Sequence, residues 1–186
     1  MRKQSFFTIL MSLLFSIASA QDFSVGIKGG INVASVGGGT YTGLSGLGSK
    51  FSFHLGGVAE VPISEKFAIQ PELLYSSQGT KWSFVGAGTS LKLDYINLPV
   101  LGKYYIIEGL SAELGPVVGF LLSTNANKED YNSLDIGIGI GASYKLNENI
   151  FFSLRYNKGL TDINKNDAIT ISNQNNVFQI SAGYLF

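Results

Sequence analysis

The sequence predicts an all-β chain folded as an eight-stranded antiparallel β-barrel of the transmembrane, outer-membrane type. Apolar and polar residues alternate with a period of two along eight segments, which is typical of strands whose two faces meet different environments. Charged residues make up only 14% of the chain, whereas ordinary soluble domains contain about 25%. The connections between the segments are alternately long and short, as in bacterial outer-membrane barrels.

The first 20 residues have the features of a secretory signal peptide. Arg2 and Lys3 precede an apolar stretch over Phe6–Ile17, and residues 18–20 (Ala-Ser-Ala) form a small-residue cleavage site. The apolar stretch is shorter than the roughly 20 residues of a membrane-spanning helix, so a retained N-terminal anchor is the less favoured alternative. We expect a signal peptide over 1–20 and an exported outer-membrane β-barrel domain over 21–186.

The composition of the expected mature domain excludes several classes of protein. It has 11 basic and 13 acidic residues, a formal net charge of −2, and therefore no basic surface for nucleic acid. The absence of cysteine excludes disulfides, thiolate metal sites and a cysteine nucleophile. No run of 18 apolar residues follows residue 20, so a transmembrane helix is not expected there. Neither a cofactor nor a metal is expected.

The alternating segments define the expected strands in order. They are Phe23–Ala34, Phe51–Val61, Phe67–Ser77, Ser90–Tyr105, Leu110–Ser123, Leu134–Leu146, Ile150–Leu160 and Asn176–Phe186. Long connections are expected at Ser35–Lys50, Gln78–Thr89, Thr124–Ser133 and Thr161–Asn175, and tight ones near 64–66, 107–109 and 147–149. An even strand number places both termini at one end, which we expect to be periplasmic, with the long loops outside. Pro99 and Pro116, which lack a ladder N–H, predict a local bulge.

Alternation alone also fits a soluble ligand-binding barrel whose apolar face lines a cavity. The polar face favours the membrane alternative, because it consists mainly of Gly, Ser and Asn with isolated charges instead of dense Lys and Glu. We therefore expect the polar face to line the lumen, and its charges to form ion pairs, since an unpaired buried charge is costly. The expected luminal network is Lys28, Glu60, Glu72, Lys92, Asp94, Glu113, Asp135, Lys145 and Arg155. Independent solvated charges are the alternative.

Aromatic residues near the ends of the apolar runs predict the girdles of a membrane barrel. The expected girdle residues are Tyr75, Tyr95, Tyr144, Tyr156, Tyr184 and Phe186. The last strand alternates up to Phe186, and its apolar positions Phe178, Ile180, Tyr184 and Phe186 resemble the C-terminal signal that the barrel-assembly machinery reads in bacterial outer-membrane proteins.

The fourth to seventh strands resemble a known family. The stretch from Tyr95 to Tyr105 (YINLPVLGKYY) resembles the Tyr-x-x-x-Pro-x-x-x-Lys-Tyr pattern of the PorT-like family of outer-membrane β-barrel proteins of the Bacteroidetes group. Leu114–Leu122, Asp135–Gly137 and the Arg155–Ile163 segment (RYNKGLTDI) fit the same family. The resemblance covers essentially the whole expected mature chain and implies an outer-membrane barrel. It supplies no catalytic residues, and the protein-secretion role of the longer founding member is not inferred for this chain.

An eight-stranded barrel has an interior just wide enough for side chains to fill it, which disfavours a water-filled pore. His54 is the single histidine; with Ser52 and Glu60 or Glu72 it raises the alternative of a hydrolytic triad, but a hydrogen-bonded luminal histidine is favoured and no enzyme is predicted. Functional residues concentrate on loops borne by a rigid scaffold. Tyr41, Trp82 and Tyr131 are the aromatic candidates for loop contacts.

The sequence thus favours a structural or interaction role in the bacterial outer membrane. Expected partners are outer-membrane lipid and lipopolysaccharide, the barrel-assembly machinery during biogenesis, and an extracellular or envelope protein of unknown identity. A small-solute channel is the first alternative, followed by a lipid-acting enzyme and a periplasmic ligand-binding barrel.

Overall fold

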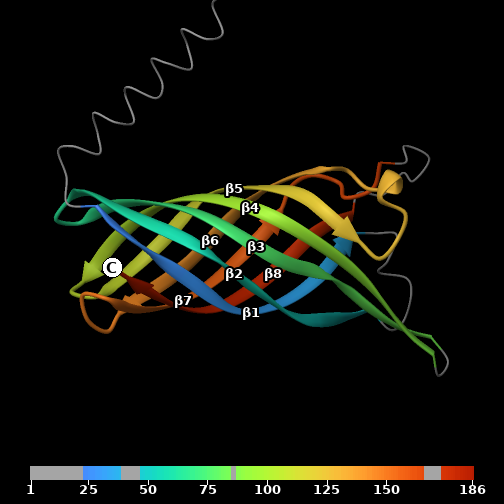
Figure 1. Ribbon diagram of the computed structural model, residues 1–186, viewed down its shortest axis with the longest axis horizontal. Coiled ribbons are helices and arrows are strands. Elements are labelled where there is room, and N and C mark those ends of the chain that lie inside the picture. The colour runs from blue at the N-terminus through green and yellow to red at the C-terminus, as the bar shows by residue number, and fades with distance from the viewer. Residues whose placement is uncertain (1–22, 39–46, 85–86, 166–172) are drawn as a thin grey trace, which may run out of the picture.

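The computed structural model describes residues 23–38, 47–84, 87–165 and 173–186. The chain forms a closed barrel in which eight antiparallel strands follow one another in sequence order (Figure 1). The strands are β1 (Ser24–Gly38), β2 (Leu47–Ser64), β3 (Phe67–Phe84), β4 (Ala87–Ile107), β5 (Leu110–Thr124), β6 (Leu134–Lys145), β7 (Ile150–Gly159) and β8 (Asn173–Leu185), with a short 3-10 helix η1 (Lys128–Asp130) after β5. The predicted fold class is confirmed.

The two ends of the barrel differ. The turns at 65–66, 108–109 and 146–149 lie at the same end as the C-terminus, which we call the turn end (Figure 1). Gly109 in the β4–β5 turn has φ +79°, a conformation that favours glycine. The other end, which we call the loop end, is where β1, β3, β5 and β7 end. β8 pairs with β1 from Gly26↔Leu185 to Gly38↔Asn173 and closes the barrel.

The prediction of a long loop at Gln78–Thr89 is wrong. β3 and β4 continue through it as a paired ribbon, with register from Gln78↔Leu93 to Phe84↔Ala87. This ribbon projects past the other strands at the loop end, at the lower right of Figure 1. Thr, Trp and Phe favour strands, and here cross-strand pairing outweighs the Gly and Ser content that suggested a loop. β1 and β2 likewise extend into the loop expected at Ser35–Lys50, and β8 begins at Asn173.

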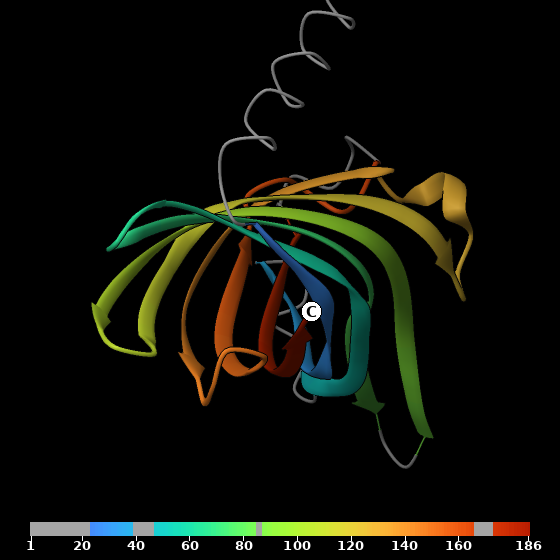
Figure 2. The ribbon, with the colours of Figure 1, turned by 60° about the vertical axis from the view of Figure 1, so that its left-hand side comes forward.

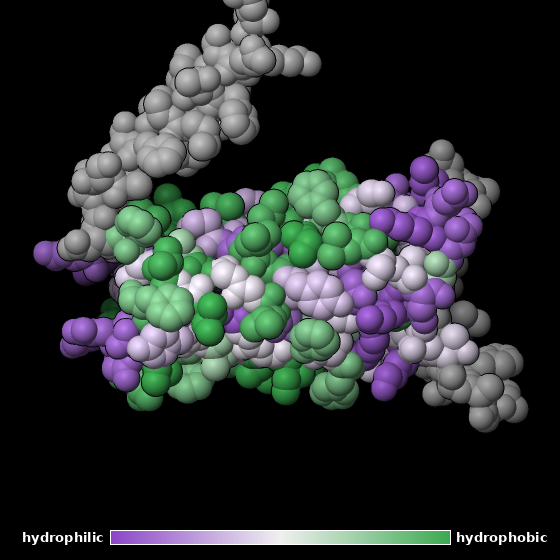
Figure 3. Space-filling model, viewed as in Figure 1, coloured by the Kyte–Doolittle hydropathy of each residue, from purple (hydrophilic) through white to green (hydrophobic). Residues whose placement is uncertain are grey.

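Apolar side chains cover the outside of the barrel. On β6, Ile136, Ile138 and Ile140 are 40–59% exposed and alternate with Gly137, Gly139 and Gly141 on the inner side. On the face seen in Figure 3, apolar residues predominate across the middle of the molecule and hydrophilic residues lie at both ends, and we call the apolar zone the apolar belt. Such a belt matches the hydrocarbon layer of a bilayer, and the polar ends match its two aqueous surfaces. Among the described residues, no helix is long and apolar enough to cross a membrane.

Two expectations for β4 are wrong. Tyr95 is only 1% exposed and lies in an interior apolar cluster, not in a lipid-facing girdle. The β4–β5 register is the same on both sides of Pro99 and Pro116, and the two irregularities lie between Asp94 and Tyr95 and between Tyr105 and Ile107 instead. A proline can be accommodated in a strand where its missing N–H is not needed by the neighbouring ladder.

Candidate functional site

The middle of the barrel is crossed by buried ion pairs that join four strands. The Arg155 guanidinium on β7 donates two hydrogen bonds of 2.7 Å to the Glu72 carboxylate on β3. Lys28 on β1 lies 3.1 Å from Glu72, and Glu113 on β5 lies 3.0 Å from Arg155. All four residues are at most 4% exposed. The two-pronged Arg–Glu geometry fixes the strands on opposite sides of the lumen relative to each other.

A second group of charges lies toward the turn end. Lys103 on β4 is 2.8 Å from Glu60 on β2, and the Tyr105 hydroxyl donates a hydrogen bond of 2.7 Å to the same carboxylate. Lys145 on β6 also pairs with Glu60. Lys103 is 3.9 Å from Glu113, which links this group to the first one. We call the combined set the luminal charge cluster; it consists of Lys28, Glu60, Glu72, Lys103, Glu113, Lys145 and Arg155.

Six of the nine residues expected in a luminal network thus lie together in this cluster. Lys92 and Asp94 instead pair with each other at 2.9 Å on the opposite face of β4, where the Lys92 side chain is 48% exposed. Asp135 makes no ion pair among the described residues; its carboxylate accepts hydrogen bonds from Asn175 at 2.8 Å and Thr161 at 2.9 Å. Lys103, which is central to the cluster, was missed.

The omission of Lys103 and the misplacement of Lys92 and Asp94 have one cause: the wrong face of β4 was assigned to the lumen. Alternation in this strand was interpreted with Lys92 and Asp94 pointing inward. The residues at odd positions from Leu91 to Lys103 are all buried instead, and Asp94 is the one buried residue at an even position of this stretch. Because side chains alternate with a period of two, a one-residue error in phase moves every side chain of the strand to the other face. The signal that could have corrected it is Asn97 and Lys103 at odd positions, opposed to apolar Val100 and aromatic Tyr104 at even ones.

His54 belongs to a buried polar layer next to the charge cluster, toward the loop end. Its Nδ1 lies 2.8 Å from Asn32 Oδ1 and its Nε2 lies 2.9 Å from Ser181 Oγ. Gln179 Nε2 donates to the same Asn32 oxygen at 2.9 Å. Ser52, the serine of the alternative triad, instead donates a hydrogen bond to the Ser77 carbonyl oxygen. His54 and Ser181 are 1% and 4% exposed, so both side chains are enclosed among the described residues.

Apolar residues cover the loop end of the lumen. The buried members of this apolar cap are Val36, Leu91, Leu93, Tyr95, Leu121 and Ile163. Tyr131, a predicted loop contact, is partly buried against the cap and pairs through its backbone with Asn164. Asn132 Nδ2 donates to the carbonyl oxygens of Asp162 and Asn164, which fastens the segment after β5 to the segment after β7.

The structure describes only the backbone of Trp82 and nothing of Tyr41, the other two predicted loop contacts. The backbone of Trp82 lies in the projecting ribbon, opposite Leu47 on β2 and Thr89 on β4. Tyr41 lies outside the described residues, as does the expected signal peptide. Of the predicted C-terminal signal, Phe178, Ile180 and Tyr184 are 40–48% exposed on the outside of β8, and Phe186 is 72% exposed.

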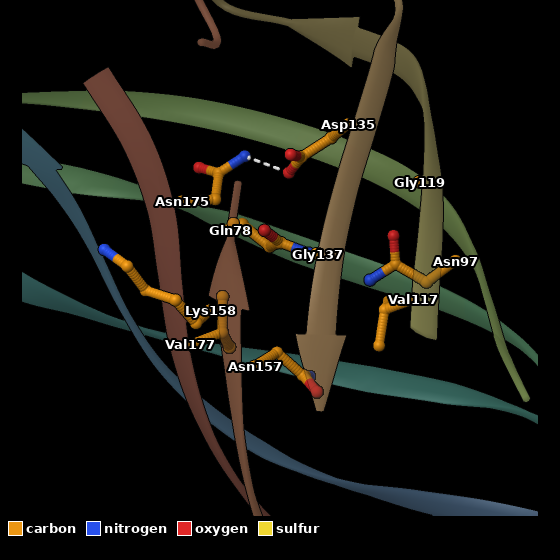
Figure 4. Close-up of a pocket in the computed structure, with 11 residues that line it drawn as sticks. Gln78, Asn97, Val117, Gly119, Asp135, Gly137, Asn157, Lys158, Asn175 and Val177 are labelled. Carbon is orange, nitrogen blue, oxygen red and sulfur yellow. Dashed lines mark hydrogen bonds between the residues drawn. The ribbon is translucent and has the colours of Figure 1, made fainter. Parts of the chain in front are cut away.

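A small polar cavity lies in the half of the lumen nearer the loop end (Figure 4). Its volume is about 20 Å³, which is room for roughly one water molecule. Asn97, Asp135, Asn157 and Asn175 line it together with glycines of β5, β6 and β7. From the turn end to the loop end, the lumen therefore contains the luminal charge cluster, the His54 layer, this small cavity and the apolar cap. Within the part of the barrel that the structure describes, such an interior can hold the eight strands rigidly together.

Comparisons with known proteins agree on the architecture. A family described as "Outer membrane protein beta-barrel domain" matches residues 19–165. Among solved structures, the chain is similar to Neisserial surface protein A (13% identity, TM-score 0.57), with 89% of this chain and 100% of that chain covered. It is also similar to Ail, the attachment invasion locus protein of Yersinia pestis (14% identity, TM-score 0.52), with 89% and 99% covered. No curated protein matches significantly. At these identities the structural similarity shows the fold.

Proposed function

This chain belongs to the family of outer membrane protein β-barrel domains, and on that premise we propose that it is a closed barrel with a structural or interaction role. Its location is the bacterial outer membrane. The observation that supports a closed barrel most strongly is the luminal charge cluster, in which six of the seven charged residues are at most 4% exposed. These side chains occupy the cross-section through which a solute would have to pass.

The alternative of a small-solute channel makes a different prediction for conductance. We expect the wild-type protein to give no discrete current steps in a planar lipid bilayer, because the buried luminal charge cluster occupies the cross-section of the described lumen. Heat-dependent migration on a denaturing gel verifies that the inserted protein is folded, and protein-free bilayers give the baseline. Reproducible ohmic steps from folded protein would overturn the closed-barrel proposal.

The interaction role is proposed for the loop end, which we place outside the cell. The β3–β4 ribbon projects past the neighbouring strands, and the segment around η1 lies beyond the end of β5 (Figure 2). Lys81 in the ribbon and Glu129 in η1 have exposed polar side chains. Tyr131 is less suitable for contact than expected, because it packs against the apolar cap.

Photocrosslinking in intact cells tests this role. A crosslinker at Lys81 or Glu129 is expected to capture a protein or glycan partner, because both side chains are exposed at the loop end. Ser143 is the matched control, since it is 2% exposed inside the barrel and bonded to Ser111. Adducts with lipopolysaccharide alone would reject a dedicated partner and favour a passive role in the envelope. Adducts at Lys81 and Glu129 that are no stronger than those at Ser143 would also reject a dedicated partner.

Finer assignments are part of the same proposal. The Tyr95–Tyr105 and Arg155–Ile163 motifs support membership in the PorT-like group. Residues 1–20 are proposed to be a signal peptide, and Phe178 and Phe186 to belong to a signal for the barrel-assembly machinery. Lipopolysaccharide is the proposed lipid neighbour of the loop end. No enzymatic activity is proposed, because Ser181 and His54 are enclosed.

A further inference from the structure

We propose that the outer wall of the barrel at the loop end binds the phosphate groups of lipopolysaccharide through Lys81, Lys92 and Lys128. The site presupposes the proposed function, in which the loop end faces outside the cell, and it adds a lipid contact beside any protein partner. The three lysines come from neighbouring parts of the wall: Lys81 from β3, Lys92 from β4, and Lys128 from η1, which follows β5. All three are exposed, and we call them the lysine row.

Strand pairing places Lys81 and Lys92 on the same face of the wall. Lys81 lies opposite Ser90, and Lys92 is two residues farther along β4. Side chains of directly opposed residues in an antiparallel pair share one face, and diagonal neighbours at this spacing lie about 7–8 Å apart. Lys92 is on the outer face, where its Nζ lies 2.9 Å from Asp94 Oδ2. Lys81 therefore projects from the outer face as well.

The segment after β5 brings Lys128 to the strand next to β4. The side-chain oxygen of Asn125 accepts a hydrogen bond of 2.8 Å from the Lys92 N–H, and its nitrogen donates to the Ser90 carbonyl oxygen at 2.7 Å, so that the segment is fastened to β4. Lys128 Nζ then donates a hydrogen bond of 2.9 Å to the carbonyl oxygen of Leu122. Leu122 is the extra residue of β5 at the register shift between β4 and β5. The ammonium of Lys128 is thus held against β5, beside the strand that carries Lys92.

The lysine row borders the apolar belt. Phe120 and Leu122 on β5 are exposed apolar residues, and Lys128 bonds the second of them. On β3, Tyr75 lies on the turn-end side of Lys81, and its ring centroid is 5.7 Å from that of Phe53 on β2. Ammonium groups next to lipid-facing side chains lie at the depth where the headgroups of a bilayer begin, and the long lysine stem can pack on the apolar surface. Lipid phosphates lie at the same depth.

Charge complementarity favours an anionic headgroup at this place. The acidic residues near the lysine row are Asp94, Glu129 and Asp130. Asp94 is already paired with Lys92. Glu129 and Asp130 are on η1, beyond the end of β5 (Figure 2), whereas the ammonium of Lys128 reaches back to the strand. Lysine binds phosphate as a compact point charge, so the edge of the belt suits a phosphate without a balancing amine, as in lipopolysaccharide.

Binding of lipid A, the phosphorylated anchor of lipopolysaccharide, to the full-length folded protein in nonionic detergent tests the site. Dephosphorylated lipid A is the matched ligand, since it keeps the acyl chains, and we expect it to bind more weakly. A lysine near an anionic lipid surface contributes about fivefold in affinity. Lys81→Gln, Lys92→Gln and Lys128→Gln should therefore each weaken lipid A binding about fivefold, and the triple variant roughly 100-fold. Microscale thermophoresis at low ionic strength measures the dissociation constants.

Lys66→Gln is the matched control, because Lys66 is also an exposed lysine but lies in the β2–β3 turn at the turn end. It should bind lipid A like the wild-type protein. Replacing all three lysines of the row with arginine keeps the charge and should keep the affinity, and heat-dependent gel migration verifies that each variant is folded.

Equal affinity of the wild-type protein for the two lipids would overturn the proposal. A triple glutamine variant that binds lipid A as tightly as the wild-type protein would also overturn it. Binding in detergent does not depend on which end of the barrel faces outside the cell. Either failure would therefore leave the closed-barrel proposal and the crosslinking test of the loop end intact.

Discussion

Replacing Glu72 with glutamine is expected to lower the free energy of unfolding by about 3–5 kcal/mol, the cost of breaking a buried ion pair by removing one partner. Glu72 balances both Lys28 and Arg155, and the side chains of all three are 0% exposed. The amide of glutamine keeps the volume but not the charge. Among the described residues, Lys28 and Arg155 would then have only Glu113 nearby, which pairs with Arg155 at 3.0 Å and already lies 3.9 Å from Lys103. Urea titration of the protein in lipid vesicles, followed by heat-dependent gel migration, measures the loss.

Lys92→Gln is the control for this experiment. It also breaks a Lys–carboxylate pair, but the Lys92 side chain is 48% exposed and solvated. Exposed pairs contribute little to stability, so the unfolding midpoint should hardly move. If Glu72→Gln and Lys92→Gln shifted the midpoint equally, the luminal charge cluster would not stabilise the barrel as argued.

Replacing Gly56 with alanine is expected to destabilise the barrel by about 1–3 kcal/mol, the usual cost of forcing an extra carbon into a packed interior. A Cβ at Gly56 would lie 1.9 Å from the Leu73 carbonyl oxygen and 2.8 Å from Leu74 Cα. Both are backbone atoms of the paired strand β3, so no side chain can rotate away and the two strands must shift. The unfolding midpoint in urea and the folded yield after refolding should both fall.

The neighbouring Gly57 provides the control within the same strand. It points outward, and the nearest atom to its Cβ position is the Gly26 carbonyl oxygen at 3.9 Å. Gly57→Ala should therefore fold like the wild-type protein. Equal behaviour of the two variants would show that the inner wall yields more easily than its backbone contacts indicate.

Much of the fold follows from local pattern. On β6, the alternation from Leu134 to Lys145 predicts both the strand and its outward face, because a strand between lipid and lumen can satisfy both only with a period of two. The same reasoning placed Lys28, Glu72 and Arg155 on inward faces, where the structure has them. It failed for β4, whose two faces are both rich in apolar residues, so that hydropathy does not set the phase.

The projecting ribbon shows a second limit of local pattern. Gln78–Thr89 contains Gly79, Gly86 and Gly88 and reads as a loop. Its strand structure depends on pairing between β3 and β4, with Lys81 opposite Ser90. Cross-strand hydrogen bonds are long-range contacts, and their contribution is not visible in the residues of one segment.

The sequence by itself determined that the chain alternates between two environments along eight segments, and hence that it closes into a membrane barrel. Only the tertiary structure decided which charges meet. Glu72 and Arg155 are separated by 83 residues, and Glu113 reaches Arg155 across 42. Which inward side chains lie at the same height in the lumen depends on the stagger between successive strands as the barrel closes. That stagger is fixed by all eight strand pairs together, so no single segment encodes it.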